Sequence, residues 1–225
     1  MPKLGMEPIR KAALVKATIA EIGAVGSLDV TVAQIARRAG MSSALAHHYF
    51  GGKEQIFLAA MRHILALYGA EVRAALANIN GPSGRNTCPK ARILAVIGAS
   101  FADSNFRQEV VSAWLHFYVL AQTVPEARRL LRVYQRRLRA NLLYGLRPLF
   151  VGMPGAAETG AAETVADGIG AMVDGLYIRL ALARGPMGLG PIDRVRAGQM
   201  VADYLEMNLR AGCLGGVPLG LGRTH

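Results

Sequence analysis

The segment that most constrains this chain runs from Thr31 to Lys53 and carries the signals of two short helices joined by a tight turn. Thr31 and Gln34 have the spacing of a capping box, in which two side chains satisfy the first backbone N–H groups of a helix. Gly40 is the type of residue that ends a helix, and Ser42 is the type that begins the next one. The segment therefore predicts helices at about 32–39 and 43–49.

This pattern is typical of a helix-turn-helix, whose second helix enters the major groove of DNA. Small residues are needed where the two helices cross, and Ala36 and Ala46 meet that need. An ordinary helical hairpin carries similar signals, so the motif alone leaves two interpretations open. We expect the first of them, a DNA-binding head.

The rest of the chain also has apolar residues at helical spacing, without strand-like alternation or an internal repeat. Gly and Pro separate the further helices, which we expect at about 7–25, 53–78, 89–102, 107–121, 125–150, 157–184 and 191–211. The sequence predicts an all-α protein with an N-terminal three-helix DNA-binding module (1–55), a C-terminal helical ligand-binding and dimerisation domain (56–211) and a flexible tail (212–225).

The net charge of +11 favours an acidic partner such as nucleic acid. Much of the excess lies outside the first 55 residues, in a row of six arginines with no acid among them: Arg128, Arg129, Arg132, Arg136, Arg137 and Arg139. Such a row is more often a solvated helix face than a second DNA site. The charge therefore does not locate the DNA contact, whereas the motif does.

Several other classes are disfavoured by what the sequence lacks. Cys88 and Cys213 lie far apart, which indicates incidental thiols in a reduced compartment. We find no signal-peptide core and no membrane-length apolar run, so we expect a cytoplasmic protein without a membrane partner. No phosphate loop, nucleophile motif or metal-ligand spacing is recognised, so no cofactor or metal is expected. An enzyme and a sequence-independent architectural DNA binder are the less favoured alternatives.

The signature from about Val15 to Phe57 resembles that of the tetracycline-repressor (TetR) family of bacterial regulators. Its matching residues are Val15, Thr18, Ile22, Gly26, Thr31, Ile35, Ala36, Gly40, Ser42, Tyr49, Phe50, Lys53 and Ile56. A closer similarity, to the choline-responsive repressors of this family, extends over M-P-K-L-G-M, A-Q-I-A-R-R-A-G, H-Y-F, A-W-L-H-F and D-G-L-Y-I-R-L-A-L.

This resemblance implies a homodimeric repressor that binds double-stranded operator DNA and controls genes converting choline to the osmoprotectant glycine betaine. A repressor of the same family that answers to a different small molecule, such as a lipophilic drug or metabolite, is the alternative. Four residues depart from the family pattern. Ala46 replaces a larger aliphatic residue, His47 stands where tyrosine is common, and Gly51-Gly52 replace polar or basic residues. The preferred DNA sequence is expected to differ accordingly.

Candidate DNA-binding residues fall into two groups, because phosphate contacts position a protein and base contacts specify sequence. The resemblance implies that Lys53 grips a backbone phosphate. Further candidates for the DNA backbone are Thr31, Arg38, His47 and Tyr49, and candidates for base edges or thymine methyl groups are Ser42, Ser43, Ala44 and His48. None of these is an arginine that reads bases, so we also expect some shape readout. A pair of solvated histidines is the alternative for His47 and His48.

The candidate effector site centres on Trp114, with Phe117 and Tyr118 at i+3 and i+4 on the same helix. A quaternary ammonium such as choline is held by aromatic faces, each favourable ring contributing about 0.5–2 kcal/mol. Further candidates are the rings of Phe101, Phe106, Tyr144 and Tyr177 and the carboxylates of Asp103, Glu109 and Asp174. Aromatic residues at helical spacing are more often plain core, and this interpretation stays open.

A dimer interface is expected on the last two helices. The first of them has an apolar stripe of Ile169, Met172, Val173, Leu176 and Leu180, with Gly168, Gly170 and Gly175 beside it to permit close approach. A symmetric dimer would bring two heads to a pseudo-palindromic DNA site.

Overall fold

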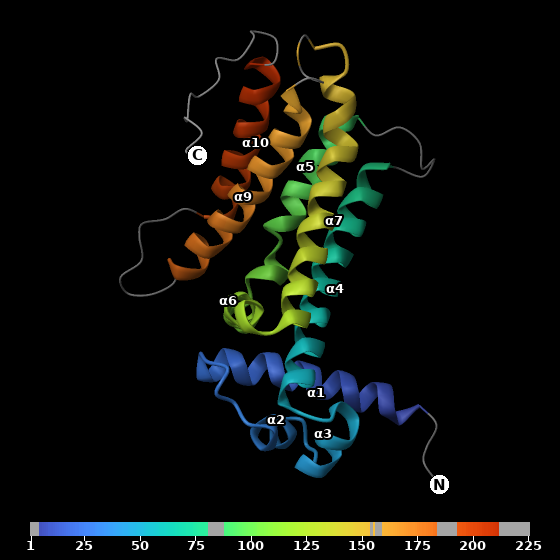
Figure 1. Ribbon diagram of the computed structural model, residues 1–225, viewed down its shortest axis with the longest axis vertical. Coiled ribbons are helices and arrows are strands. Elements are labelled where there is room, and N and C mark those ends of the chain that lie inside the picture. Colours follow the sequence, from blue (N-terminus) through green and yellow to red (C-terminus); the bar gives the residue numbers. More distant parts are fainter. Residues whose placement is uncertain (1–4, 81–87, 154, 156–158, 184–192, 212–225) are drawn as a thin grey trace, which may run out of the picture. The chain divides into compact units, whose positions relative to one another are not determined.

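The computed structural model describes residues 5–80, 88–153, 155, 159–183 and 193–211, and all regular structure within these ranges is helical (Figure 1). The all-α prediction is thus confirmed. The elements are α1 (Met6–Val25), α2 (Val32–Arg38), α3 (Ser43–Phe50), α4 (Lys53–Asn80), α5 (Pro89–Ser100), the 3-10 helix η1 (Asp103–Phe106), α6 (Gln108–Thr123), α7 (Pro125–Phe150), α9 (Ala161–Leu182) and α10 (Arg194–Ala211). The predicted starts of the last two helices, at 157 and 191, and the predicted tail lie outside the described residues.

The chain packs as two compact units. Unit 1 contains residues 1–74 and 99–136, and unit 2 contains residues 75–98 and 137–225. The division falls within α4 and α7, so each of these helices contributes to both units. These packing units differ from the functional division at residue 55, which stays a prediction.

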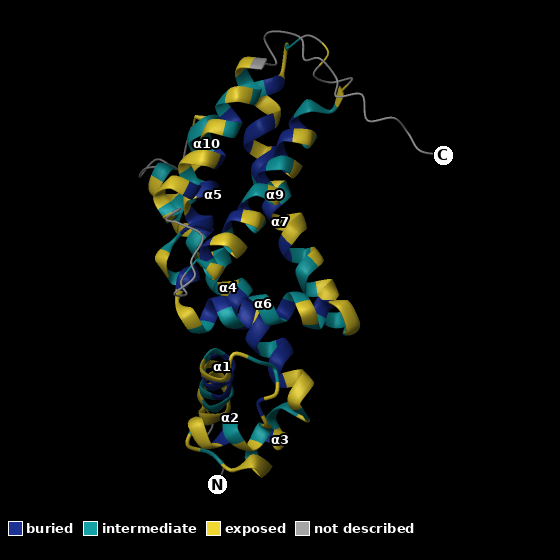
Figure 2. Ribbon diagram, turned by 90° about the vertical axis from the view of Figure 1, so that its left-hand side faces the viewer, coloured by how far each residue is buried: buried dark blue, intermediate teal, exposed yellow. Residues whose placement is uncertain are grey.

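Within unit 1, α1 packs against α2, α3 and α6. Leu14 and Ile22 of α1 are completely buried. Figure 2 shows how buried and exposed residues alternate along the helices. Gly23 is the point of closest approach, because a Cβ atom there would lie 2.6 Å from the Cα atom of Glu109 on α6. Ser112, one turn further along α6, donates a hydrogen bond to the carbonyl oxygen of Ile22 at 3.4 Å. The two helices therefore meet backbone to backbone.

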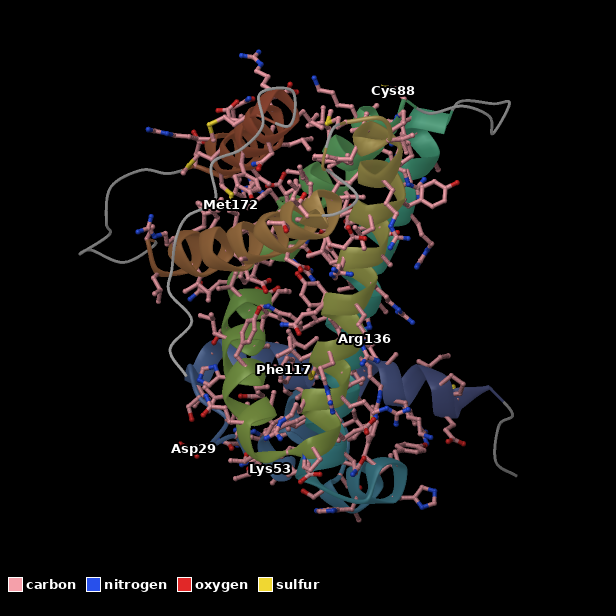
Figure 3. The ribbon with its side chains drawn as sticks, turned by 45° about the horizontal axis from the view of Figure 1, so that its top comes forward. Asp29, Lys53, Cys88, Phe117, Arg136 and Met172 are labelled. Atoms are coloured by element: carbon pink, nitrogen blue, oxygen red, sulfur yellow. The ribbon has the colours of Figure 1, made fainter. Side chains whose placement is uncertain are left out.

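The arginine row of α7 is an exposed helix face, as the sequence indicates. Arg128 donates hydrogen bonds to the carbonyl oxygens of Ala121 and Gln122 at the end of α6. Arg132 and Arg136 are exposed and have no hydrogen-bond or ion-pair partner among the described residues. Figure 3 marks Arg136 on α7. This part of α7 therefore carries positive charge that the described chain does not neutralise.

Within unit 2, glycines allow helices to pack closely. A Cβ atom at Gly168 of α9 would lie 2.2 Å from the hydroxyl oxygen of Tyr204 on α10, and one at Gly145 of α7 would lie 2.7 Å from Cγ1 of Ile93 on α5. Ion pairs add to this packing, including Arg139 with Asp167 at 2.6 Å. The close approach that Gly168 permits is thus a contact inside the chain.

The apolar stripe predicted to form the dimer interface is also internal. Ile169, Val173, Leu176 and Leu180 are each at most 7 % exposed within the single chain, so they belong to the core of unit 2. That part of the interface prediction is wrong, because the pattern marks a buried face without showing what buries it. Other apolar side chains of the same two helices remain exposed: Ile178, Leu182, Val195, Met200 and Met207.

Within the described ranges, no helix is both long enough and apolar enough to cross a membrane.

Candidate DNA interface and effector site

The start of α2 is fixed by the predicted capping box. The backbone N–H of Thr31 donates to Oε1 of Gln34 at 2.6 Å, and the backbone N–H of Gln34 donates to Oγ1 of Thr31 at 3.2 Å. Ser42 begins α3 in a similar way, since its Oγ accepts a hydrogen bond from the backbone N–H of Leu45 at 3.2 Å. Both helices of the motif therefore begin where the sequence indicates.

The turn between α2 and α3 is a Schellman motif. Gly40 has φ +67°, its N–H donates to the carbonyl oxygen of Arg37 at 3.1 Å, and the N–H of Met41 donates to that of Ala36 at 2.8 Å. Ala36 and Ala46 are fully buried where α2 packs on α3. The geometry of a helix-turn-helix is present, and the small residue at position 46 lies in its core.

The outer face of α3 is open to solvent, which base contacts require. Ser42, Ser43, Ala44, His47 and His48 are all exposed. One ring nitrogen of His47 already makes a hydrogen bond within the chain. Its Nδ1 lies 3.3 Å from the carbonyl oxygen of Gly51 and must carry the hydrogen of that bond. The other ring nitrogen of His47 takes no part in this contact.

Two candidate phosphate contacts are held in place by neighbouring side chains. Tyr49 accepts a hydrogen bond on its hydroxyl oxygen from Nη1 of Arg10 at 3.3 Å, which leaves the hydroxyl hydrogen to be donated elsewhere. Lys53 begins α4, and its ammonium lies 5.5 Å from the ring centroid of buried Phe57 (Figure 3). The start of a helix also favours anions, so this position suits a phosphate.

Arg38 has a partner that the sequence did not reveal. Its Nε donates to Oε1 of Glu21 on α1 at 2.7 Å, and Glu21 is only 8 % exposed. The two residues are seventeen positions apart, beyond the reach of any local pattern. This ion pair ties the last turn of α2 to α1.

Trp114 lies at the centre of a row of aromatic rings drawn from three helices of unit 1. It makes edge-to-face contacts with Tyr118 and with Tyr134 of α7, at centroid distances of 5.5 and 5.4 Å. Tyr134 makes a third such contact with Tyr68 of α4, at 5.3 Å. Sequence reasoning missed Tyr68 and Tyr134, because nothing local shows that α4 and α7 meet α6 at these positions.

Polar groups accompany this row of rings. The hydroxyl groups of Tyr68 and Ser100 are 3.2 Å apart, and Ser100 is buried. Glu71, one turn after Tyr68 on α4, accepts a hydrogen bond from Ser104 at 2.7 Å. A half-buried carboxylate therefore lies on the Tyr68 side of α4, and the sequence did not single it out.

The remaining effector candidates from unit 1 have other surroundings. Phe117 is 1 % exposed and belongs to the core, and Phe101 and Phe106 stack on each other at 6.4 Å. Glu109 lies against Gly23 of α1 and approaches Arg107 to 3.7 Å. Asp103 is exposed at the start of η1.

Three candidates belong to unit 2. Tyr144 is 71 % exposed, and the guanidinium of Arg92 lies over its ring at 4.4 Å, so a cation of the chain already occupies that face. Tyr177 and Asp174 are half-buried on α9. Among the described residues, no group of three or more His, Cys, Asp or Glu side chains is arranged to hold a metal ion.

Comparison with known proteins agrees with this geometry. Residues 14–60 match the family described as bacterial regulatory proteins, tetR family, and residues 89–210 match the BetI-type transcriptional repressor, C-terminal. The chain is 47 % identical over 209 residues to the HTH-type transcriptional regulator BetI of Brucella anthropi, covering 93 % of this chain and 98 % of that protein. It is 43 % identical over 211 residues to BetI of Agrobacterium fabrum, covering 94 % and 93 %.

Solved structures show the same fold. A transcriptional regulator from Pseudomonas aeruginosa superposes with a TM-score of 0.72 at 24 % identity, over 94 % of this chain and 95 % of that one. A regulator from Saccharomonospora viridis, solved in complex with choline, superposes with a TM-score of 0.64 at 20 % identity, over 88 % and 96 %.

The chain matches these transcriptional regulators over nearly their whole length. This protein is therefore a DNA-binding transcriptional repressor and not an enzyme. The chain belongs to the TetR family of bacterial regulators and carries the C-terminal domain of the BetI-type repressors.

Proposed function

We propose that this repressor responds to choline or a closely related quaternary ammonium compound and controls genes for glycine betaine synthesis. The observation that carries the proposal is the row of aromatic rings around Trp114, combined with the high identity to BetI regulators. The choline complex of a protein with the same fold supports it. A repressor of bacterial operators acts in the cytoplasm, which is the location we propose.

A trimethylammonium group donates no N–H bonds, so its binding depends on the faces of aromatic rings. Rings in edge-to-face contact stand at steep angles to each other, here 74° and 77° around Trp114. In such a contact the edge of one ring covers one face of the other, and the opposite face of that ring is left for a cation. We infer that Trp114, Tyr118, Tyr134 and Tyr68 provide the ring faces and that Glu71 adds a negative charge.

Calorimetric titration with choline tests this site. Trp114→Leu should weaken binding by about 0.5–2 kcal/mol beyond what lost packing explains, and Tyr134→Phe, which keeps the ring, should bind nearly as well as the unmodified protein. The control is Tyr144→Leu, whose ring already carries Arg92. A neutral 3,3-dimethylbutyl analogue should bind more weakly than choline. If the analogue binds as tightly as choline, or if choline does not bind, the choline proposal is rejected. The protein would then be a TetR repressor with a different effector.

On the DNA side, we propose that Ser42, Ser43, Ala44 and His48 meet base edges or thymine methyl groups. Thr31, Arg38, His47, Tyr49 and Lys53 would contact backbone phosphates. The exposure of the α3 face and the support given to Tyr49 and Lys53 favour this division. Because TetR regulators act as dimers, two such heads would meet one operator.

A DNA duplex selected from random sequences by the protein itself serves as the probe. Tyr49→Ala and Lys53→Ala should each weaken binding by about 1 kcal/mol on selected and random duplexes alike, through lost phosphate contacts. Ser43→Ala and His48→Ala should instead change which duplexes are selected. Arg73→Ala, an exposed cation on α4, is the matched control and should do neither. If both α3 variants select the same duplexes as the unmodified protein, residues other than Ser43 and His48 recognise the bases.

A further inference from the structure

Glu21 is the one buried acidic residue among those the structure describes, at 8 % exposure. It lies on α1 between Thr18 and Ile22, which are both fully buried. A carboxylate in such a place loses much of its hydration, and this costs stability unless a hydrogen-bonded partner compensates. The capping of α1 does not involve this side chain.

The partner is Arg38, the last residue of α2, with Nε donating to Oε1 of Glu21 at 2.7 Å. The Arg38 side chain is still 43 % exposed. A guanidinium has five N–H donors, and Nε carries only one of them. Among the described residues the Nη groups of Arg38 have no acceptor, so the exposed end of the fork keeps its donors free.

Arg38 also lies at the end of α2, directly before the turn of the motif. Ala39 and Gly40 follow it directly, and the chain then turns into Ser42 and α3. The first helix of a helix-turn-helix crosses the DNA backbone, and its end is next to the groove. A guanidinium held at this point by a buried carboxylate is oriented before DNA arrives.

We propose that Glu21 is a positioning residue for operator binding, which fixes Arg38 so that its free N–H groups meet a DNA phosphate. This proposal rests on the assignment of Arg38 to the DNA backbone made above. The long side chain of Arg38 loses its rotational freedom when the protein folds instead of when it binds, and such preorganisation strengthens binding. Glu21 thus acts through Arg38 without touching the DNA.

Charge alone predicts the opposite effect, and this makes the proposal testable. Glu21→Gln adds one positive charge per subunit, which by electrostatics should tighten DNA binding. Positioning predicts instead that the released Arg38 binds phosphate less well, so that affinity for the selected duplex falls about threefold. Glu54→Gln makes the same charge change on exposed Glu54 of α4 and should leave affinity unchanged or higher.

The experiment measures the dissociation constant of the full-length dimer for the selected duplex across a salt series, at a temperature where circular dichroism shows each variant folded. Arg38→Gln should weaken binding about five- to tenfold and lower the slope of log K against log salt by about two, one for each subunit. The double variant E21Q/R38Q should bind no more weakly than R38Q alone, because Glu21 acts only through Arg38.

The outcomes separate the two claims. If Arg38→Gln leaves both affinity and salt slope unchanged, Arg38 does not contact phosphate and its assignment fails. If Arg38→Gln weakens binding but Glu21→Gln does not, the contact stands and the positioning role is overturned. Should Glu21→Gln not fold, Arg38→Lys replaces it: an ammonium paired with Glu21 offers no fork to the phosphate, so binding as tight as in the unmodified protein would overturn the proposal.

Discussion

Gly40 shows how one residue sets the angle between the two helices of the motif. Its φ of +67° belongs to the left-handed region, and a Cβ atom there would have nothing within 4 Å. Gly40→Ala should therefore lower the free energy of unfolding by about 1 kcal/mol, through backbone strain alone. Urea unfolding measures this loss. Gly52→Ala, equally open but outside the left-handed region, is the control, and an equal loss there would contradict the explanation.

His63 on α4 makes stability depend on pH. Burial lowers the pKa of His63 below its usual 6.5, and the nearby cations Lys16 and Arg107 lower it further. The unfolded chain therefore binds this proton more readily, so the contribution of His63 is complete above about pH 6.5 and is lost as pH falls below that value. The free energy of unfolding should drop between about pH 7.5 and 5.5. The drop should be smaller in His63→Gln, and an equal drop would rule out this residue as a cause.

The sequence around the helix-turn-helix was sufficient to predict the caps of α2 and α3, but it was not sufficient to predict the ion pair between Glu21 and Arg38. Thr31, Gln34 and Ser42 act within three residues of themselves, so their spacing in the sequence determines their hydrogen bonds. Glu21 and Tyr134 act on residues of other helices, and only the packing of those helices brings them there. The caps of the DNA-binding motif were therefore predictable from the sequence, whereas its Glu21–Arg38 ion pair and the contacts of Tyr68 and Tyr134 around Trp114 were not.

At the scale of elements, the contact of α1 with α6 has a sharp requirement at Gly23. A methyl group there would meet the Cα and Cβ atoms of Glu109 at 2.6 Å, so the helices must move apart. Gly23→Ala should cost about 1–3 kcal/mol of stability in spite of its better helix propensity. Gly98→Ala, on an exposed and open position of α5, should instead gain up to about 1 kcal/mol. Thermal unfolding measures both changes. If Gly23→Ala also raised the melting temperature, the contact between α1 and α6 would have room for a methyl group.

Helices were predictable as elements because Gly, Pro and capping residues mark their ends along the chain. The 3-10 helix η1 was not, since it depends on the side chain of Asn105 reaching the carbonyl oxygen of Ala99 and on Phe106 stacking on Phe101. The apolar stripe of α9 was found but assigned to the wrong neighbour. Helical periodicity shows which face is covered, while the covering surface depends on how the rest of the chain folds.

At the scale of the whole molecule, this correction changes the residues that should hold the dimer. We propose that the exposed apolar residues of α9 and α10 form the interface, among them Ile178 and Leu182, at 36 % and 64 % exposure. Leu182→Arg should give a folded monomer in sedimentation velocity, with reduced operator affinity. Leu176→Arg should instead unfold unit 2, because it buries a charge in the core.

The control for this prediction is Val119→Arg, which makes the same change on exposed Val119 of α6 and should remain dimeric. A dimeric Leu182→Arg variant that binds the selected duplex normally would exclude this residue from the interface.

The unneutralised arginines of α7 have a consequence for kinetics. Arg132 and Arg136 lie about two and three helical turns after the start of α7, and they are not among the residues that we propose contact DNA. Their field acts on the approaching duplex, over about 30 Å in 0.01 M salt but only about 8 Å in 0.15 M. Removing them should slow association in dilute buffer and leave dissociation nearly unchanged, so we expect this face to affect how fast the repressor finds DNA more than how long it stays bound.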